Sequence, residues 1–302
     1  MLDFDARNLS PMLFQESEEV FDSADHLYEL KFDGIRSLAY LDDGTDLVNK
    51  RGKLLNATYP ELADLHSSAK EKVLLDGEIL LVKDGKPDFY ALQKRAMMTD
   101  PLKIKIQAEM NPVVYVAFDL LYLKDGFIID KPLIERKKLL EQFVKESKQL
   151  AISKYIENRG KELFQAAKKM NLEGIVAKEK NSPYYPGKRS SVWLKMKVYK
   201  EEDLVILGYV PKEHTIDLVL GRYQEGKFEK AGTVVTGKFK DKIVRFSEKH
   251  PAEPHFPEPK NAIWMLPKLV GRVRYMMKTK TGGLRQPVFM GLRDDKFVDD
   301  LS

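Results

Sequence analysis

The pattern of apolar and polar positions in the first 200 residues is typical of strands separated by a few helices. Apolar, β-branched or aromatic runs predict strands at 26–32, 37–41, 72–82, 112–123, 174–180 and 192–198. Between these runs, apolar residues recur at near-helical spacing in segments that begin near Leu133 and Gly160, and both segments predict helices. We therefore predict an α+β domain with extensive antiparallel sheet.

After residue 200 the pattern changes to that of a small β domain. Strands are predicted at 204–210, 216–223, 227–235 and 270–278, with one helix over 237–250. The proline-rich segment 251–260 predicts a loop. A polar segment, 199–203, separates two apolar runs, and we place the domain boundary there, between domains 1–200 and 201–302.

Length and composition limit the class of protein. A chain of 302 residues predicts about two domains, and an apolar content of 43% is sufficient for packed cores. No run reaches the roughly 18 apolar residues that a membrane span needs. The acidic start of the chain is unlike a signal peptide. The absence of cysteine excludes disulfides, thiolate zinc sites and cysteine nucleophiles. We expect a soluble, cytoplasmic, monomeric protein without a membrane partner.

The net charge of +5 is uninformative, but its distribution is uneven. No Asp or Glu occurs between Pro259 and Arg293. The basic residues of this stretch are Lys260, Lys268, Arg272, Arg274, Lys278, Lys280, Arg285 and Arg293. So long an acid-free stretch in a nearly charge-balanced chain predicts a face that binds nucleic-acid phosphates. The alternative is a solvated basic face without a partner.

Two motifs that suggest other chemistry fail on inspection. Residues 232–238 resemble a phosphate-binding P-loop, but Phe239 stands where a Ser or Thr would bind Mg²⁺. The five histidines have no metal-ligand spacing. We expect neither a P-loop nor a histidine-bound metal.

A lysine lies at the centre of the most informative segment, Glu29-Leu-Lys31-Phe-Asp33-Gly34-Ile-Arg36. In an apolar strand, desolvation or a neighbouring cation lowers the pKa of a lysine and makes its free amine available as a nucleophile. Gly34 permits a tight turn, and Arg36 is placed to contact a phosphate or a ribose. Taken alone, Lys31 is also explained as a solvated lysine at a sheet edge.

Two carboxylates and two further lysines fit the same chemistry. Glu78 and Glu173 each lie beside a glycine within an apolar strand, and two such acids suit Mg²⁺ with a phosphate substrate. Lys195 and Lys197 are two residues apart, hence on one face of a strand, where they fit a polyphosphate.

These motifs and their order along the chain resemble those of the covalent nucleotidyltransferase superfamily. The resemblance is closest to ATP-dependent DNA ligases, and specifically to the ligase module of bacterial ligase D. The matching segments are ELKFDGIR (29–36), LDGEIL (75–80), YVAFDLLYL (115–123), EGIVAK (173–178), SPYYPGKRSSVWLKMK (182–197) and FMGLRDDK (289–296). The resemblance implies an α+β nucleotidyltransferase (adenylation) domain with antiparallel sheets, followed by a β-barrel OB-fold domain. It also implies ATP and Mg²⁺ or Mn²⁺ as cofactors.

The resemblance implies that Lys31 attacks the α-phosphate of ATP, expels pyrophosphate and forms lysyl-AMP. Glu29 and Phe118 would belong to the adenine pocket, with Phe118 stacked on the base. Arg36 would contact the ribose or the phosphate at the nick. Glu78 and Glu173 would hold the nucleotide and the catalytic metal.

The remaining implied roles concern phosphate groups and the ribose. Lys195 and Lys197 would bind the α-phosphate, and Arg293, with Asp295 and Lys296, would close over ATP to orient the pyrophosphate. The family usually has Ser-Arg-Asn-Gly near the ribose, whereas residues 49–52 here read Asn-Lys-Arg-Gly. Lys50 and Arg51 therefore both remain candidates for this contact.

These roles imply that the chain seals nicks or breaks in duplex DNA, with a hinge at 199–203 between the domains. Lys268, Arg272, Arg274, Lys278, Lys280 and Arg285 are the predicted DNA-binding residues. A Ku-like end-binding protein is a candidate partner by family analogy. The alternatives are an RNA ligase, an mRNA-capping guanylyltransferase and a non-catalytic nucleic-acid-binding protein. An NAD⁺-dependent ligase is disfavoured because that family carries a cysteine zinc site.

Overall fold

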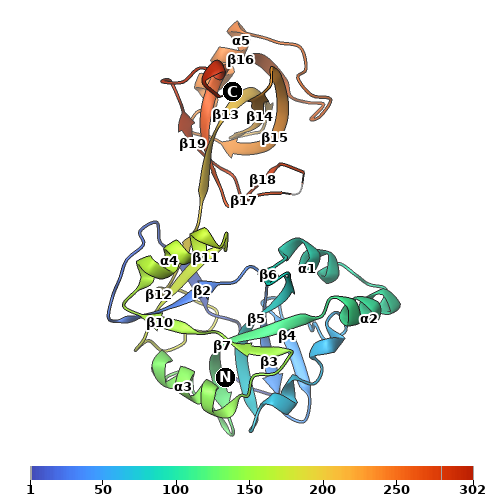
Figure 1. Cartoon of the computed structure of the whole chain (residues 1–302), viewed down its shortest axis with the longest axis vertical. Coiled ribbons are helices and arrows are strands. Elements are labelled where there is room, and N and C mark those ends of the chain that lie inside the picture. The colour runs from blue at the N-terminus through green and yellow to red at the C-terminus, as the bar shows by residue number, and fades with distance from the viewer. Residues whose placement is uncertain (1, 280, 302) are drawn as a thin grey trace. The chain divides into compact units, whose positions relative to one another are not determined.

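The computed structural model describes residues 2–279 and 281–301, and the chain divides into two compact units, Met1–Val198 and Tyr199–Ser302 (Figure 1). Within these described residues, the first unit contains two large sheets and four α-helices, and the second contains one large sheet and one α-helix. None of the helices in the described residues combines the length and apolarity that a bilayer crossing needs.

The first sheet of the N-terminal unit has the strand order β1-β12-β11-β2-β10. Its strands are β1 (Leu13–Glu16), β12 (Arg189–Lys197), β11 (Gly174–Glu179), β2 (His26–Lys31) and β10 (Tyr155–Glu157). Every neighbouring pair is antiparallel except β1 and β12. Helix α4 (Gly160–Lys169) covers one face, where Ala167 packs with Ile175 and Met196.

The second sheet of this unit follows the order β4-β3-β5-β7-β8, with β6 paired to β5 and β9 paired to β7. Its strands are β4 (Thr45–Asn49), β3 (Ile35–Leu41), β5 (Val73–Lys83), β7 (Val113–Leu123), β8 (Gly126–Phe127), β6 (Lys86–Pro87) and β9 (Leu150–Ile152). Only the pair of β7 and β9 is parallel. The prediction of an α+β domain with extensive antiparallel sheet is confirmed.

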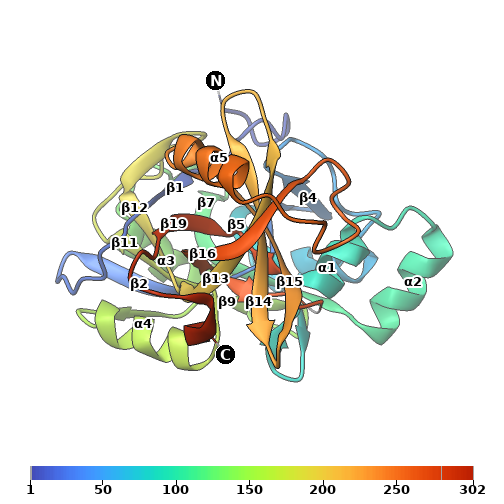
Figure 2. The ribbon, with the colours of Figure 1, turned by 90° about the horizontal axis from the view of Figure 1, so that it is seen from above.

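One hydrophobic core joins the two sheets, which face each other in Figures 1 and 2. Leu27 and Trp193 enter it from the first sheet, and Leu38 and Phe118 enter it from the second. Strand β7 contributes residues on both faces, since Tyr115 packs in a different core on the far side of the second sheet. Burial on both faces explains why β7 reads as a nearly continuous apolar run.

Three of the helices lie over the second sheet or beside it. They are α1 (Phe89–Ala96), α2 (Pro101–Met110) and α3 (Leu133–Phe143), and the N-terminal unit also has short 3₁₀ helices at Pro60–Leu62 and Leu65–Ser68. Helices α3 and α4 are confirmed predictions, but α1 and α2 were not predicted. The missed signals are Asp88 and Asp100, whose carboxylates accept backbone N–H groups as N-caps.

The C-terminal unit contains a five-stranded antiparallel sheet in the order β15-β14-β13-β16-β19. Its strands are β15 (Lys227–Thr236), β14 (Ile216–Gln224), β13 (Lys200–Pro211), β16 (Ile263–Tyr275) and β19 (Val288–Leu292). The remaining elements are α5 (Lys240–Lys249), the short pair β17 (Met277–Lys278) and β18 (Leu284–Arg285), and a 3₁₀ helix at Val298–Leu301. The predicted helix over 237–250 is confirmed as α5.

Strand β13 differs from the prediction at its start. We predicted this strand over 204–210, after the polar segment 199–203, but β13 already begins at Lys200. Its acidic residues pair across the ladder with β16, where Glu201 lies opposite Arg274 and Asp203 opposite Arg272. Opposite charges in facing positions favour the strand despite its polarity.

Candidate active site

The registers of three neighbouring strands place the predicted lysines on one face of the first sheet. Lys31 on β2 lies opposite Gly174 on β11, and Gly174 lies opposite Lys197 on β12. Glu29 and Lys195 lie two residues away on their strands, in the adjacent row. Because side chains two residues apart point to the same face, all four charged groups share one side of the sheet.

The glycine between the two lysines leaves the centre of this row without a side chain. Gly174 has φ +147°, a conformation that other residues rarely adopt. A Cβ atom there would lie 2.1 Å from the carbonyl oxygen of Met196. The backbone therefore requires glycine at this position, and the space between Lys31 and Lys197 stays open.

Lys31 ends β2, and its Nζ lies 2.7 Å from Oε2 of Glu173. The Glu173 side chain is only 8% exposed. Burial raises the pKa of Glu173, although the charge and hydrogen bond of Lys31 partly oppose the shift. The nucleophile candidate therefore faces a carboxylate that can accept a proton.

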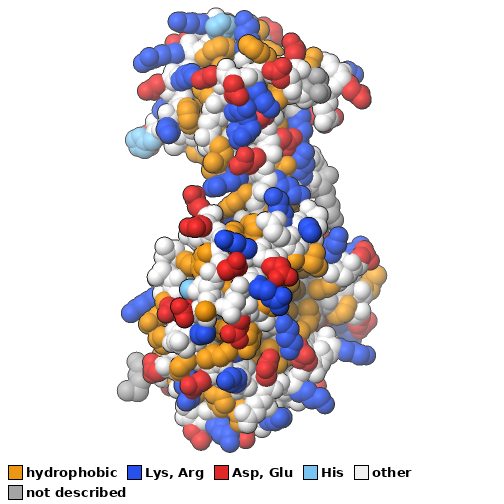
Figure 3. Space-filling model, turned by 60° about the vertical axis from the view of Figure 1, so that its left-hand side comes forward, with side chains coloured by type: hydrophobic (Ala, Val, Ile, Leu, Met, Phe, Trp, Pro, Cys, Tyr) orange, Lys and Arg blue, Asp and Glu red, His pale blue; other side chains and the backbone are white. Residues whose placement is uncertain are grey.

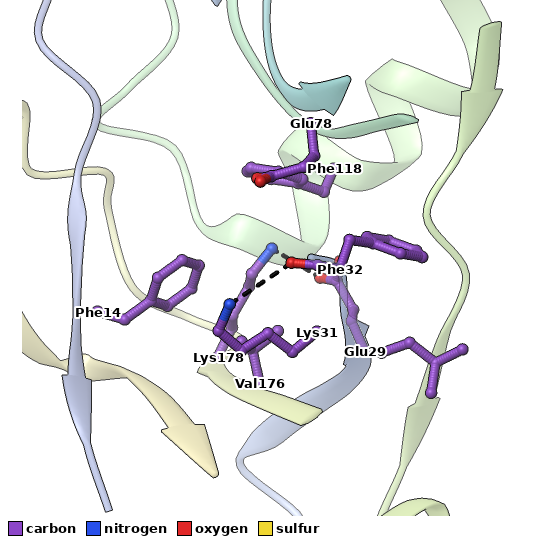
Figure 4. Close-up of a pocket in the computed structure, with 9 residues that line it drawn as sticks. Phe14, Glu29, Lys31, Phe32, Glu78, Phe118, Val176 and Lys178 are labelled. Carbon is purple, nitrogen blue, oxygen red and sulfur yellow. Dashed lines mark hydrogen bonds and ion pairs between the residues drawn. The ribbon is translucent and has the colours of Figure 1, made fainter. Parts of the chain in front are cut away.

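Glu78 on β5 lines the same pocket as Lys31. Burial raises the pKa of Glu78 to about 7, against the attraction of Arg36 and Lys31, and the nearby charge of Glu173 raises it further. Figure 4 shows Glu78 and Phe118 on one side of the pocket and Val176 and Lys178 on the other. Two acids with raised pKa values thus lie close to Lys31.

Lys195 and Lys197 share a carboxylate from the first strand of the chain. Their Nζ atoms lie 3.3 and 3.7 Å from Oε2 of Glu16 on β1. Burial and the neighbouring Lys195 lower the pKa of Lys197. The paired ammonium groups therefore repel each other in part, and an anion between them would relieve that repulsion.

Glu29 lines the pocket and belongs to a buried charged cluster. Its carboxylate forms ion pairs with Lys137 (2.7 Å) and Lys178 (2.9 Å), and the Ser153 hydroxyl donates to it at 2.7 Å. Burial opposes ionisation of Glu29, but the two lysines outweigh it and lower its pKa. Neither Lys137 nor Lys178 was predicted as a site residue.

Lys178 lies among aromatic rings at the floor of this pocket. Its Nζ lies 4.5 Å from the ring centroid of Phe118 and 4.4 Å from that of Trp193. Burial lowers the pKa of Lys178 to about 8, against the attraction of Glu29. Phe118, the predicted adenine-stacking residue, thus lines the pocket with a cation over its ring.

Arg36 is engaged by Asp76 in the structure. Its Nε and one terminal nitrogen each donate to Asp76 at 2.6 Å, and Tyr184 also donates to this carboxylate at 2.6 Å. The Arg36 guanidinium lies over Phe118, 4.6 Å from the ring centroid. The sequence analysis did not identify Asp76 or Tyr184, which orient Arg36.

Lys50 and Arg51, the two ribose candidates, lie in an exposed turn after β4. The Asn49 carboxamide oxygen accepts the backbone N–H groups of Arg51 and Lys53, and Gly52 has φ +77°. Neither candidate lines the pocket around Lys31. The structure places Glu29, Glu78 and Phe118 in that pocket with Lys31, but not these two.

The structure supplies a partial donor set for a metal. No group of three or more Asp, Glu or His side chains in residues 2–279 and 281–301 is arranged to hold a metal ion. Mg²⁺, however, is usually held by one or two carboxylates together with waters and substrate phosphates. Glu78 and Glu173 therefore fit an ion that binds together with a nucleotide.

In the C-terminal unit, Arg293, Asp295 and Lys296 form one charged cluster with Asp203 of β13. Arg293 donates to both oxygens of Asp295 (2.8 and 2.7 Å) and to Asp203 (2.8 Å). Lys296 lies 2.9 Å from Asp203, which also accepts from Arg272 at 2.9 and 3.2 Å. The sequence analysis did not identify Asp203.

The predicted DNA-binding stretch is partly neutralised by acids of β13. Arg272 pairs with Asp203 and Glu201, and Lys278 pairs with Glu202. Figure 3 accordingly shows basic and acidic side chains interleaved on the visible face of this unit.

The other members of that stretch differ in their surroundings. Lys268 is exposed, and the Arg274 guanidinium lies 4.5 Å from the ring centroid of Tyr199. Arg285 is half-buried and lies near Met277. Lys280 falls outside the described residues.

Comparisons with known proteins show that both units match family models. A family model described as the ATP dependent DNA ligase domain matches residues 11–197. A second, described as the ATP dependent DNA ligase C terminal region, matches residues 212–296.

Curated relatives match along most of the chain. The SPbeta prophage-derived DNA ligase-like protein LigB of Bacillus subtilis is 33% identical over 287 residues, which cover 94% of this chain and 99% of LigB. The multifunctional non-homologous end joining protein LigD of Mycolicibacterium smegmatis is 30% identical over 313 residues, and a DNA ligase of Archaeoglobus fulgidus is 34% identical over 295. The matches cover 97% and 90% of this chain, but only 39% and 52% of those two relatives.

A solved structure of mycobacterial DNA ligase D, complexed with ATP and MES, aligns over 98% of both chains with a TM-score of 0.58 and 29% identity. The ligase domain of LigD from M. tuberculosis aligns equally widely, with a TM-score of 0.58 and 28% identity.

Proposed function

The chain belongs to the ATP-dependent DNA ligase family, and from this premise we propose that it seals nicks or breaks in duplex DNA through an AMP group carried on Lys31. One observation carries the proposal: Nζ of Lys31 lies 2.7 Å from the Glu173 carboxylate, in a pocket that Phe118 and Glu78 also line. A lysine beside a proton acceptor and an aromatic ring suits attack on a nucleotide.

In the first step, the free amine of Lys31 attacks the α-phosphorus of ATP. A P–N bond forms, the bond from the α-phosphorus to the bridging oxygen breaks, and pyrophosphate leaves. Glu173, whose Oε2 lies 2.7 Å from Nζ, takes the proton and passes it to solvent, so that its carboxylate is ionised again. Lys195 and Lys197 neutralise charge on the α-phosphate from the same sheet face.

The second and third steps transfer and then release AMP. An oxygen of the DNA 5′-phosphate attacks the lysyl-AMP, so that a P–O bond forms and the P–N bond breaks. The 3′-hydroxyl then attacks the activated 5′-phosphate and expels AMP, which leaves a sealed strand. Arg36, oriented by Asp76, is proposed to contact the ribose or the phosphate at the nick.

The donor set around Lys31 supports a requirement for Mg²⁺ or Mn²⁺. Glu78 and Glu173 would hold the ion together with phosphate oxygens of ATP. The bound ion would neutralise charge that develops on the phosphates during the reaction.

For the C-terminal unit we propose an OB-fold barrel that contacts DNA. Five antiparallel strands with one helix between β15 and β16 support this assignment. Its cations Lys268, Arg274, Lys278 and Arg285 would contact phosphates. By analogy with the family, Arg293 and Lys296 would bind the pyrophosphate during the first step, and the C-terminal unit would move about the segment 199–203. By the same family analogy, a Ku-like protein would recruit the enzyme to DNA ends.

The direct test incubates the protein with Mg²⁺ and ATP labelled at the α-phosphate. We expect covalent label on the wild type and none on Lys31→Ala, whereas Lys154→Ala, an exposed lysine of the same unit, should label normally. Label from GTP in place of ATP would indicate a capping-type enzyme. Preference for nicked RNA over nicked DNA in a sealing assay would indicate an RNA ligase.

A further inference from the structure

Asp203 forms ion pairs with three cations of the C-terminal unit. Its carboxylate accepts from Arg272 at 2.9 and 3.2 Å, from Arg293 at 2.8 Å, and pairs with Lys296 at 2.9 Å. The Asp203 side chain is only 8% exposed. A hydrogen bond from Arg272, together with the pairing of Lys296, lowers the pKa of Asp203 to about 2 against the effect of burial. The carboxylate therefore stays ionised under all ordinary conditions.

Two carboxylates set the orientation of the Arg293 guanidinium. Asp295 accepts from Nε and one terminal nitrogen, and Asp203 accepts from the other terminal nitrogen. These contacts use three of the five N–H donors that arginine has, and they leave two for a ligand. Because Asp203 also pairs with Lys296, it sets the spacing between the ammonium and the guanidinium group.

We propose that Asp203 is a positioning residue for the first step of the reaction. Its carboxylate holds Arg293 and Lys296 at the spacing that a pyrophosphate group requires. This inference rests on the proposed function. Asp203 itself does not touch ATP; it acts through the two cations. Without its charge, three neighbouring cations would repel one another and separate, so the site for the leaving pyrophosphate would lose its geometry.

If Asp203 acts in this way, its substitution should affect only the formation of lysyl-AMP and the reversal of that step. Pyrophosphate takes part in the formation of lysyl-AMP and in its reversal, but not in the sealing of a nick that already carries a 5′-adenylate. A merely structural role for Asp203 would weaken all three reactions together. The Asp203 side chain is only 8% exposed, but Asn has nearly the same shape and keeps one of the two acceptor oxygens, so a folded Asp203→Asn variant is expected.

The experiment compares Asp203→Asn, Asp203→Glu and the matched control Asp217→Asn. Asp217 belongs to the same unit and pairs with Lys212, an exposed lysine, at 3.4 Å. Each full-length variant is assayed for labelling by ATP, for release of label by added inorganic pyrophosphate, and for sealing of a pre-adenylated nick.

For Asp203→Asn we expect labelling and pyrophosphate-driven release both to fall roughly ten-fold or more, from the loss of charge-assisted hydrogen bonds. The concentration of pyrophosphate needed for half-maximal release should rise, and Asp203→Glu should recover part of the loss. Sealing of the pre-adenylated nick, and every activity of Asp217→Asn, should stay within about two-fold of wild type, as for an exposed surface pair.

Equal loss of all three activities in Asp203→Asn, or no loss in any, would overturn the inference. In both cases wild-type labelling would leave the proposed function intact. Absence of label on the wild type itself would overturn the proposed function and the inference with it.

Discussion

Lys31 and Glu173 form an ion pair, with 2.7 Å between Nζ and Oε2, although 142 residues separate them in the chain. The pair exists because β2 and β11 are antiparallel neighbours with Lys31 opposite Gly174, the residue after Glu173. In the proposed mechanism the amine of Lys31 must be uncharged when it attacks ATP, and Glu173 is the carboxylate placed to take its proton.

Glu173→Gln should therefore slow the labelling of Lys31 by about 10²- to 10⁴-fold near pH 7, the usual contribution of a general base. The residual rate should rise steeply with pH, because solvent must then deprotonate Lys31. The rate of labelling measured from pH 6 to 9 checks this. Glu179→Gln, at the other end of β11, is the matched control and should behave as wild type.

Substitution of Gly174, which lies opposite both Lys31 and Lys197, tests the close backbone packing inferred at this position. Ala at this position places a Cβ 2.1 Å from the Met196 carbonyl oxygen and requires a strained φ of +147°. We expect Gly174→Ala to destabilise the N-terminal unit by about 2–3 kcal/mol and to slow labelling at temperatures where it remains folded. Gly126→Ala, where a Cβ would meet nothing within 4 Å, is the control for urea unfolding. Equal stability of the two variants would contradict the close packing inferred at Gly174.

Much of the fold follows from local pattern, as strand β7 and the Lys195–Lys197 pair illustrate. The apolar run 112–123 predicted β7 to within a residue, because its burial on two faces leaves a continuous signal. The spacing of Lys195 and Lys197 placed both on one strand face, where β12 has them. Such features depend on residues close together in sequence, and sequence patterns record them.

Local sequence patterns do not show which residues of two distant strands lie opposite each other. The stretch from Pro259 to Arg293 contains no acid, which suggested an open basic face, yet the ladder of β13 and β16 places Glu201 and Asp203 beside Arg272. Similarly, Lys137 reaches Glu29 from α3, and no local pattern marks that contact. Pairing that depends on register and helix docking is fixed only when the sheets assemble.

The raised pKa of Glu78 predicts a cost in stability that depends on pH. Its folded-state pKa, about 7, lies above the ordinary value of 4.5, so the folded protein binds this proton more tightly than the unfolded chain does. The cost is absent below about pH 4.5, grows between the two pKa values and is constant above pH 7.

Glu78→Gln should accordingly raise the free energy of unfolding above pH 7 by at most about 3 kcal/mol, a ceiling that partial solvent exposure reduces. No gain is expected near pH 4, and labelling of Lys31 should fall. Urea unfolding from pH 4 to 8 measures the difference. Glu71→Gln, an exposed surface acid, should show no such pH dependence, and an equal gain at pH 4 and pH 8 would rule out ionisation as its cause.

The charge environment of the basic stretch predicts which of its cations contribute to the salt dependence of DNA binding. Each phosphate contact adds about 0.9 to the slope of log affinity against log salt. Lys260 and Lys268 are exposed, whereas Arg272 is paired with Asp203 and Glu201. A cation that already has a carboxylate partner releases less counterion when DNA binds.

Lys260→Gln combined with Lys268→Gln should therefore reduce the salt slope by up to about 2, while Arg272→Gln should change it by clearly less than 1. Fluorescence anisotropy of a labelled nicked duplex, titrated between low and physiological salt, measures both slopes. Lys212→Gln, an exposed lysine of the same unit outside the basic stretch, is the control and should leave the slope unchanged. An unchanged slope in the double variant would show that this end of the stretch does not contact phosphates, and a larger effect of Arg272→Gln would show that DNA displaces Asp203 from its partner.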